Sequence, residues 1–157
     1  MKTLRALLVL SLALVATPAF ADEQTEEKTY DPLTRNIYEK LLPGKTIKGE
    51  YRRMRERTKT FNFTEEHFAD GTTNYREGTL NEKGVWYPLG KQKICYKYPN
   101  SPNMGGNTNC FWVYKSEKCY YGYTINQMTL SGPRDYNNWV ARWVIKGTGG
   151  SCDTPVS

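Results

Sequence analysis

The chain has 157 residues, of which 38% are hydrophobic and 13% aromatic, and it contains four cysteines and one histidine. Lysine and arginine outnumber aspartate and glutamate by 22 to 16, which gives a formal net charge of +6 at pH 7. So mild an excess indicates solubility and argues against a dedicated polyanion-binding protein. The length suits one domain.

The first 21 residues have the three parts of a secretory signal peptide. Lys2 and Arg5 give a positive start, residues 7–15 are almost entirely apolar, and Ala19-Phe20-Ala21 is a signal-peptidase pattern. The apolar run is far shorter than the ~20 residues that span a bilayer. We therefore expect a mature protein in the periplasm or the medium, with no transmembrane segment and no nucleic-acid partner.

The N-terminal part of the mature chain predicts little regular structure. Residues 22–34 are polar and acidic, which is typical of a flexible lead-in. Thr34 is suited to cap a short helix over residues 36–42, and Pro43-Gly44 would end it. We expect the rest of the chain, residues 35–157, to form a single domain.

From residue 46 on, the chain consists of short runs rich in Tyr, Phe, Trp, Val and Thr, separated by turn residues. Alternation in the last run puts Trp139, Ala141, Trp143 and Ile145 on one face. About eight antiparallel strands and one short N-terminal helix predict an all-β fold, a small up-and-down barrel or a strongly curled sheet. A two-sheet sandwich is the alternative. The expected strands are 46–56, 59–68, 72–80, 84–89, 92–98, 110–116, 119–126 and 138–146.

The four cysteines lie at separations of 15, 9 and 33 residues, at Cys95, Cys110, Cys119 and Cys152. Structural metal sites use close pairs such as C-x-x-C, and none occurs, so we expect no metal ion and no cofactor. A catalytic thiol would need a base such as His67, which is far away in sequence, and exported thiols tend to oxidise. Disulfides are the remaining interpretation.

Three pairings of four cysteines are possible, and the expected strands favour one of them. A Cys95–Cys110 bridge closes the neck of a hairpin with a loop of fourteen residues, and a Cys119–Cys152 bridge fixes the C-terminal tail to a strand. Loop-entropy arithmetic gives each a stabilisation of about 3 kcal/mol. We predict this pairing.

Several short motifs are combined in the mature chain. They are Gly84-Val85-Trp86, Ile94-Cys95-Tyr96, Cys110-Phe111-Trp112-Val113 and Gly122-Tyr123, preceded by Leu41, Pro43-Gly44-Lys45-Thr46, Phe68 and Asp70-Gly71. In this combination the chain resembles a bacterial exported family known as domain of unknown function 995. The resemblance covers most of the mature chain. It implies an exported, periplasmic single domain and assigns no functional residues.

The sequence favours binding over catalysis. The acidic candidates Glu50, Glu56, Glu65, Glu66 and Glu77 show no diagnostic spacing. Binding candidates are of two kinds. One is a row of arginines on a single strand face, suited to grip anionic groups; the other is a group of aromatic residues beside lysines, suited to sugar rings or proteins. They are Arg53, Arg55, Arg57, Trp112, Tyr121 and Tyr123.

These features lead to the hypothesis of an exported, non-enzymatic β-domain that binds a cell-envelope saccharide or a protein partner. Two alternatives stay open. One is a hydrolase that uses carboxylates in the mouth of a barrel. The other is a small inhibitor of a secreted enzyme.

The exported protein should begin at Asp22 and contain no free thiol, because the cleavage pattern ends at Ala21 and the compartment is oxidising. N-terminal sequencing and alkylation without reductant check the two parts. Alkylation of two or more cysteines in the native protein would contradict the disulfide assignment.

Overall fold

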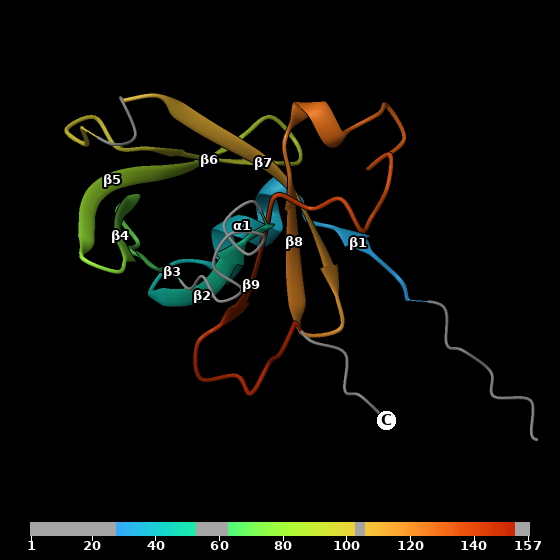
Figure 1. Cartoon of the computed structure of the whole chain (residues 1–157), viewed down its shortest axis with the longest axis horizontal. Helices are drawn as coiled ribbons and strands as arrows, with labels where there is room; N and C mark the ends of the chain where they lie inside the picture. The colour runs from blue at the N-terminus through green and yellow to red at the C-terminus, as the bar shows by residue number, and fades with distance from the viewer. Residues whose placement is uncertain (1–27, 53–62, 103–105, 153–157) are drawn as a thin grey trace, which may run out of the picture.

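The computed structural model describes residues 28–52, 63–102 and 106–152. Within these ranges, eight antiparallel strands form a closed barrel, accompanied by one further short strand and one short α-helix (Figure 1). The expectation of an all-β up-and-down barrel with a short N-terminal helix is confirmed. A two-sheet sandwich is excluded, since the last strand pairs with the first strand of the barrel.

Each barrel strand pairs with the strands before and after it in the sequence, and β9 returns to β2. This closure sets Ile47 opposite Ile145 and Tyr51 opposite Ala141. The eight strands are β2 Lys45–Tyr51, β3 Phe63–His67, β4 Thr72–Glu77, β5 Leu80–Leu89, β6 Lys93–Lys97, β7 Thr108–Ser116, β8 Cys119–Tyr123 and β9 Ala141–Ile145.

β5 and β7 are long enough to change partners along their length. The first half of β5 pairs with β4 and the second half with β6, and Val85 pairs with both. Because the pairing with β4 extends back to Leu80, the strand begins there and not at residue 84 as expected. The second half of β7 has left β6, and its free edge is covered by β1, Asp31–Pro32, which pairs with Lys115 and Tyr114. Residues 28–34 of the expected lead-in are thus packed against the barrel, and Leu33 is buried.

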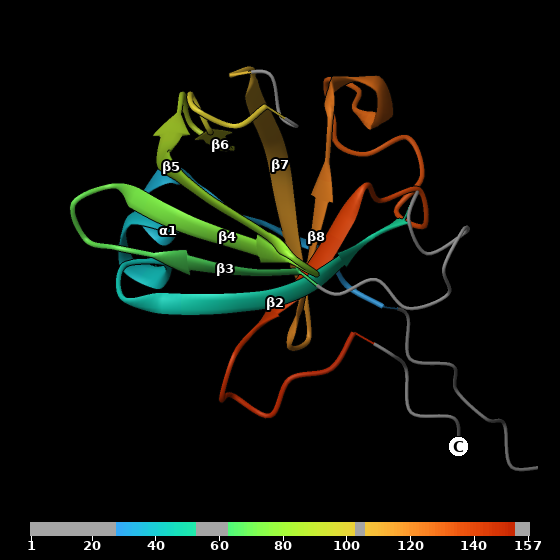
Figure 2. The same ribbon diagram turned by 60° about the vertical axis from the view of Figure 1, so that its left-hand side comes forward.

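The helix α1, Arg35–Leu41, closes one end of the barrel. Its Tyr38 side chain is buried and donates a hydrogen bond to the backbone oxygen of Gln92, 3.0 Å away, in the β5–β6 turn. The backbone N–H of Arg35 donates to the oxygen of Lys91 at 2.8 Å in the same turn. Figure 2 shows α1 beside the start of β2, at the end of the barrel opposite to the end of that strand.

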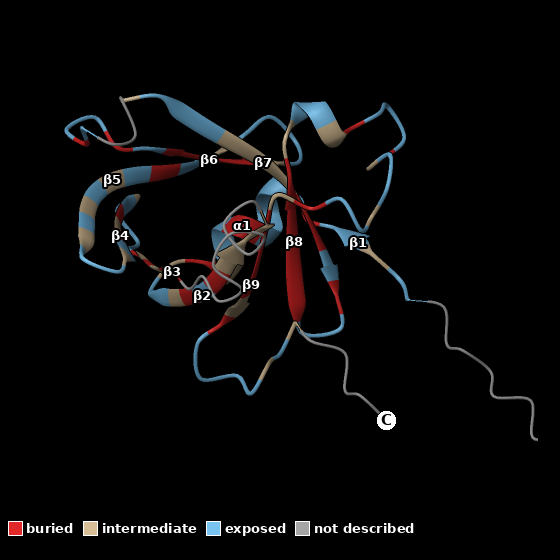
Figure 3. Ribbon diagram, viewed as in Figure 1, coloured by how far each residue is buried: buried red, intermediate tan, exposed pale blue. Residues whose placement is uncertain are grey.

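The protein has two apolar clusters, one inside the barrel and one on its outer face. The inner cluster contains Ile47, Phe63 and Trp143, whereas the outer one contains Tyr114, Tyr121 and Tyr123 of β7 and β8. Since residues of the segment between β8 and β9 pack in the outer cluster, β8 is buried along its whole length (Figure 3).

One expectation about β9 is wrong in part. Ala141, Trp143 and Ile145 do share the inner face, but Trp139 belongs to the outer cluster. The reason is that β9 begins at Ala141, so strand alternation does not extend back to residue 139.

Both predicted disulfides are confirmed. Cys95 and Cys110 are directly paired residues of β6 and β7, with Cα atoms 4.1 Å apart. Cys119 and Cys152 have Cα atoms 4.9 Å apart and attach the C-terminal segment to the start of β8. Arg142 supports this attachment, since its guanidinium donates to the backbone oxygen of Cys152 at 3.0 Å.

Gly49 marks the place in β2 where barrel closure leaves no room for a side chain. An added Cβ would lie 2.5 Å from the carbonyl oxygen of Arg142 and 2.7 Å from Cβ of Trp143. Both atoms are fixed by the pairing of β2 with β9.

We expect G49A to lower the free energy of unfolding by about 2–3 kcal/mol in urea denaturation. K48A, on the exposed face of the same strand, should change it by less than about 0.5 kcal/mol; equal losses would contradict this packing.

Candidate functional site

A cavity of about 330 Å³ lies inside the barrel, away from α1. Its rim is formed where β2 and β4 end and where β7 and β9 begin. This volume is at the lower end of the range that small-molecule sites occupy, ~300–1,000 Å³. The lining residues are Ile47, Tyr51, Phe63, Glu65, Tyr75, Glu77, Tyr96, Tyr98, Asn109, Phe111, Thr124, Val140, Ala141 and Trp143.

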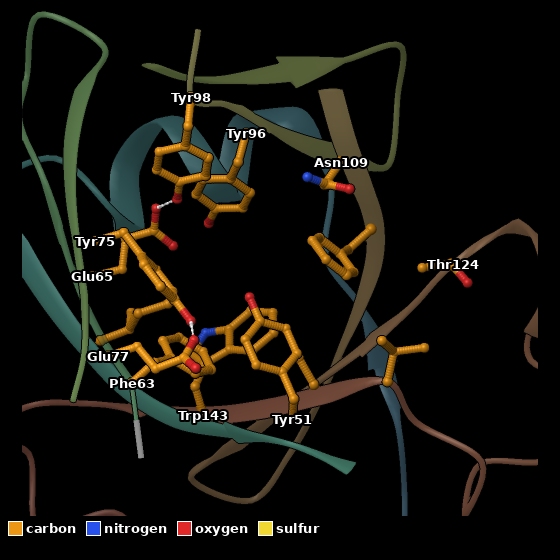
Figure 4. A pocket seen from close by; sticks show the side chains of 14 residues that line it. Tyr51, Phe63, Glu65, Tyr75, Glu77, Tyr96, Tyr98, Asn109, Thr124 and Trp143 are labelled. Carbon is orange, nitrogen blue, oxygen red and sulfur yellow. Dashed lines mark hydrogen bonds between the residues drawn. The ribbon is translucent and has the colours of Figure 1, made fainter. Parts of the chain in front are cut away.

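Half of the lining residues carry aromatic rings, because strand alternation turns these rings inward from several strands (Figure 4). Phe63 of β3 has its ring centroid 4.9 Å from that of Tyr51 and 5.6 Å from that of Tyr75. The Tyr75 and Tyr98 rings meet edge to face at 5.8 Å. These cross-strand contacts hold the rings in place around the cavity.

Glu65 brings a carboxyl group to the wall of this apolar space. Thr73 Oγ1 donates a hydrogen bond to Glu65 Oε1 at 3.0 Å, and the Tyr98 hydroxyl donates to the same oxygen. The side chain is only 4% exposed. Burial raises the pKa of Glu65 to about 7, against the lowering effect of these two hydrogen bonds.

Glu77 is the second carboxyl group in the cavity. Its Oε2 accepts a hydrogen bond from the hydroxyl of Tyr75, two residues earlier on the same inward face of β4. Burial, together with the neighbouring Tyr51 and Glu77, raises the pKa of Tyr75, so its hydroxyl keeps its proton and remains a donor. Phe63 is the cross-strand partner of Glu77, as Tyr75 is of Glu65, so the two carboxyl groups are diagonal neighbours on adjacent strands.

His67 lies next to the cavity wall and does not line the cavity itself. The ring is fully buried, and its Nε2 is 3.0 Å from the hydroxyl of Tyr96, a lining residue. Burial lowers the pKa of His67 to about 4, so the imidazole is neutral at pH 7. The chain's only histidine is therefore a packed, neutral residue of the barrel interior.

The aromatic binding candidates do not form an exposed surface. Tyr121 and Tyr123 are 3% and 0% exposed, because the segment between β8 and β9 packs over them. The Tyr123 hydroxyl donates to the backbone oxygen of Tyr136 at 2.8 Å. Trp112 is partly buried in the same outer cluster, and its ring lies 5.0 Å from Lys93 Nζ. None of these three lines the inner cavity.

The arginine row, Arg53, Arg55 and Arg57, lies outside the described residues, as does Glu56. Of the other acidic candidates, Glu50 forms an ion pair with Arg142 at 2.5 Å between Oε1 and Nη2. Glu66 takes part in the wall of a small outer pocket with Thr46 and Lys146. Of the four acidic candidates within the described residues, Glu65 and Glu77 line the cavity.

The sequence contains a usable signal for this site. Phe63 sits in a strand whose alternate residues face inward, so Glu65 and His67 fall on the buried face two and four residues later. A carboxyl group at such a position indicates either a structural network or a binding site. The spacing of Glu65 and Glu77 along the chain does not reveal that they line one cavity, because strand register decides it.

In comparisons with protein-family models, curated proteins and solved structures, nothing matches this chain. The resemblance to the domain of unknown function 995 family stays a prediction. Among the described residues, no three His, Cys, Asp or Glu side chains gather in a way that would hold a metal ion. Nor does that part of the chain contain a helix long and apolar enough to span a bilayer.

Glu65 and His67 should make opposite contributions to the pH dependence of stability. The pKa of Glu65 rises from 4.5 to about 7 on folding, so the folded state retains a proton over this interval and stability falls as the pH rises. The pKa of His67 falls from 6.5 to about 4, so stability rises with pH between these values.

The substitution Glu65→Gln removes the first contribution and leaves the second. The difference in unfolding free energy, wild type minus variant, should fall by roughly 2 kcal/mol between pH 5 and pH 8. Urea denaturation at each whole pH value measures it. Glu66→Gln, the neighbouring residue that is only partly buried, serves as the control and should give a difference without this slope. A difference for Glu65→Gln that does not vary with pH would show that the carboxyl group is ionised as in solution.

Proposed function

We propose that the protein is an exported binding protein that holds one small organic ligand inside its barrel. The observation that carries this proposal is the cavity of about 330 Å³, which lies away from α1 and has a wall of aromatic rings and a few polar groups. Small-molecule sites combine an apolar wall with a few placed polar groups in this manner. The mouths of β-barrels are among their preferred locations.

The kind of partner follows from the shape of the site. The sequence favours an envelope saccharide or a protein, and an enclosed cavity supports the small molecule over the protein. Aromatic faces accept flat or ring-shaped groups, and Glu65, Glu77 and Asn109 offer polar contacts at different depths. A single ring of a saccharide belongs to this class of ligands.

Export is part of the proposal and is supported by two kinds of observation. The N-terminal residues have a signal-peptide pattern. The two disulfides, Cys95–Cys110 and Cys119–Cys152, are of the kind that persist in the periplasm or outside the cell. An oxidising compartment would keep the outer cluster and the C-terminal segment attached to the barrel.

A carboxylate-dependent hydrolase is the second candidate, and one observation favours it. Glu65 and Glu77 share a cavity, and the raised pKa of Glu65 suits a general acid near neutral pH. Conversion of the retained ligand, followed by mass spectrometry, would support this candidate if both Glu65→Gln and Glu77→Gln abolish it. Retention of an unchanged ligand supports binding without catalysis.

Filling the cavity should abolish binding without unfolding the barrel. Ala141 faces the cavity from β9, so Ala141→Leu places three extra carbon atoms in the ligand's space. Protein prepared from its own cell-envelope extract should carry a small molecule that native mass spectrometry detects in the wild type and not in Ala141→Leu. The control is Val144→Leu, on the outer face of the same strand, which should retain the ligand. Equal occupancy of the two variants would contradict the proposal.

A further inference from the structure

The cavity has a one-sided distribution of charge. Two acidic residues, Glu65 and Glu77, line the cavity. No Lys, Arg or His among the described residues lines it. Carboxyl groups inside proteins are normally paired with a cation. Neither of these two forms an ion pair with a described residue. The described part of the cavity wall therefore has acidic side chains and no basic one.

Each carboxyl group has one oxygen in use and one that remains available. The two donors to Glu65, Thr73 and Tyr98, both contact Oε1, and the donor to Glu77, Tyr75, contacts Oε2. Within the described part of the chain, Glu65 Oε2 and Glu77 Oε1 have no hydrogen-bond donor. Figure 4 shows both carboxyl groups on the cavity side of their strands. The free oxygens can accept hydrogen bonds from a ligand.

The rings beside the carboxyl groups favour the same kind of ligand. In Figure 4, Tyr51, Phe63 and Trp143 lie close to Glu77 on one side of the cavity. Aromatic faces carry negative electrostatic potential and attract organic cations within about 6 Å of the ring centroid. An inorganic cation would gain little from them and would require more oxygen ligands than two carboxyl groups supply.

We infer that the ligand carries an organic ammonium group, which binds at a carboxyl group of the cavity, Glu65 or Glu77, and against the aromatic rings of the cavity. The inference rests on the proposed function, because it names the ligand class of the same cavity. The ammonium group donates N–H bonds to Glu65 Oε2 or Glu77 Oε1, while the carbon part of the ligand lies on the aromatic faces. Anionic ligands are rejected by the same two groups.

Binding of an ammonium group should also change the protonation of Glu65. Among the described residues, the titratable groups around Glu65 are Tyr51 of β2, the neutral His67 two residues later on the same face of β3, Tyr75 and Glu77 of β4, Tyr96 of β6 and Tyr98 just after it. In the absence of a cation, burial keeps the carboxyl group protonated up to about pH 7. A bound cation favours the ionised form, so a proton is released on binding below that pH.

Three probes of nearly equal shape and different charge test the inference. They are 2-phenylethylamine, 2-phenylethanol and phenylacetate, which carry charges of +1, 0 and −1 at pH 7. In isothermal titration of the mature protein we expect the amine to bind at least tenfold more tightly than the alcohol, and phenylacetate to bind most weakly. Glucosamine and glucose, compared in the same way, show whether the ammonium group is recognised on a sugar ring as well.

Substitutions separate charge recognition from the shape of the cavity. Glu77→Gln and Glu65→Gln keep an oxygen acceptor for the neighbouring hydroxyl groups and should reduce the preference for the amine to threefold or less, with the alcohol little affected. Glu66→Gln, next to Glu65 and only partly buried, should leave the preference unchanged. Titration at pH 6 in two buffers of different ionisation enthalpy should show proton release with the amine, and none in Glu65→Gln.

The possible failures are distinguishable. If the alcohol binds as tightly as the amine and Ala141→Leu abolishes both, the ammonium inference is overturned and the binding function stands. If phenylacetate binds best, the inference is likewise overturned. If no probe binds and the wild type carries no more ligand from its extract than Ala141→Leu does, both the inference and the proposed function are wrong.

Discussion

The pairing of β9 with β2 is the constraint on which the other features depend. It joins the last strand to the first strand of the barrel over five residue pairs, from Ile47–Ile145 to Tyr51–Ala141. Closure pairs the outer edges of the first and last barrel strands with each other and gives every barrel strand one inner and one outer face. The tight contact of Gly49 with Trp143 reflects how closely the two strands approach. The cavity exists because closure also brings Ala141 and Trp143 to face the rings and carboxyl groups of β3 and β4.

The two ends of the barrel differ in their side chains, and this difference locates the site. At one end, Tyr38 and Leu42 from α1 and its cap fill the interior. At the other, the interior contains tyrosines and two glutamates, which fill space less completely. Polar groups in such a place interact strongly with each other and with any bound charge, because little water screens them. The raised pKa of Glu65 is a direct result of this environment.

Local patterns in the sequence predict the fold well, and non-local packing explains what they miss. Alternating apolar residues and turn residues indicate the strands, and the positions of Cys95, Cys110, Cys119 and Cys152 relative to the strands indicate the disulfides. The burial of Tyr121 and Tyr123 depends on how residues between β8 and β9 fold back over the barrel, which has no local signature. The presence of Glu65 and Glu77 in one cavity depends on the register between β3 and β4 and on which face of each strand turns inward.

The position of α1 also determines which part of the proposed ligand the cavity can contact. Because the helix obstructs one end, a ligand that enters from the other end goes in with one terminus first and leaves by the same route. Whatever follows that terminus remains near Asn109, Thr124 and Val140 at the rim or extends into solvent. Under the proposed function, such a barrel would distinguish chain ends and tolerate any length beyond them. It would thus take a free metabolite or the exposed tip of a polymer equally well.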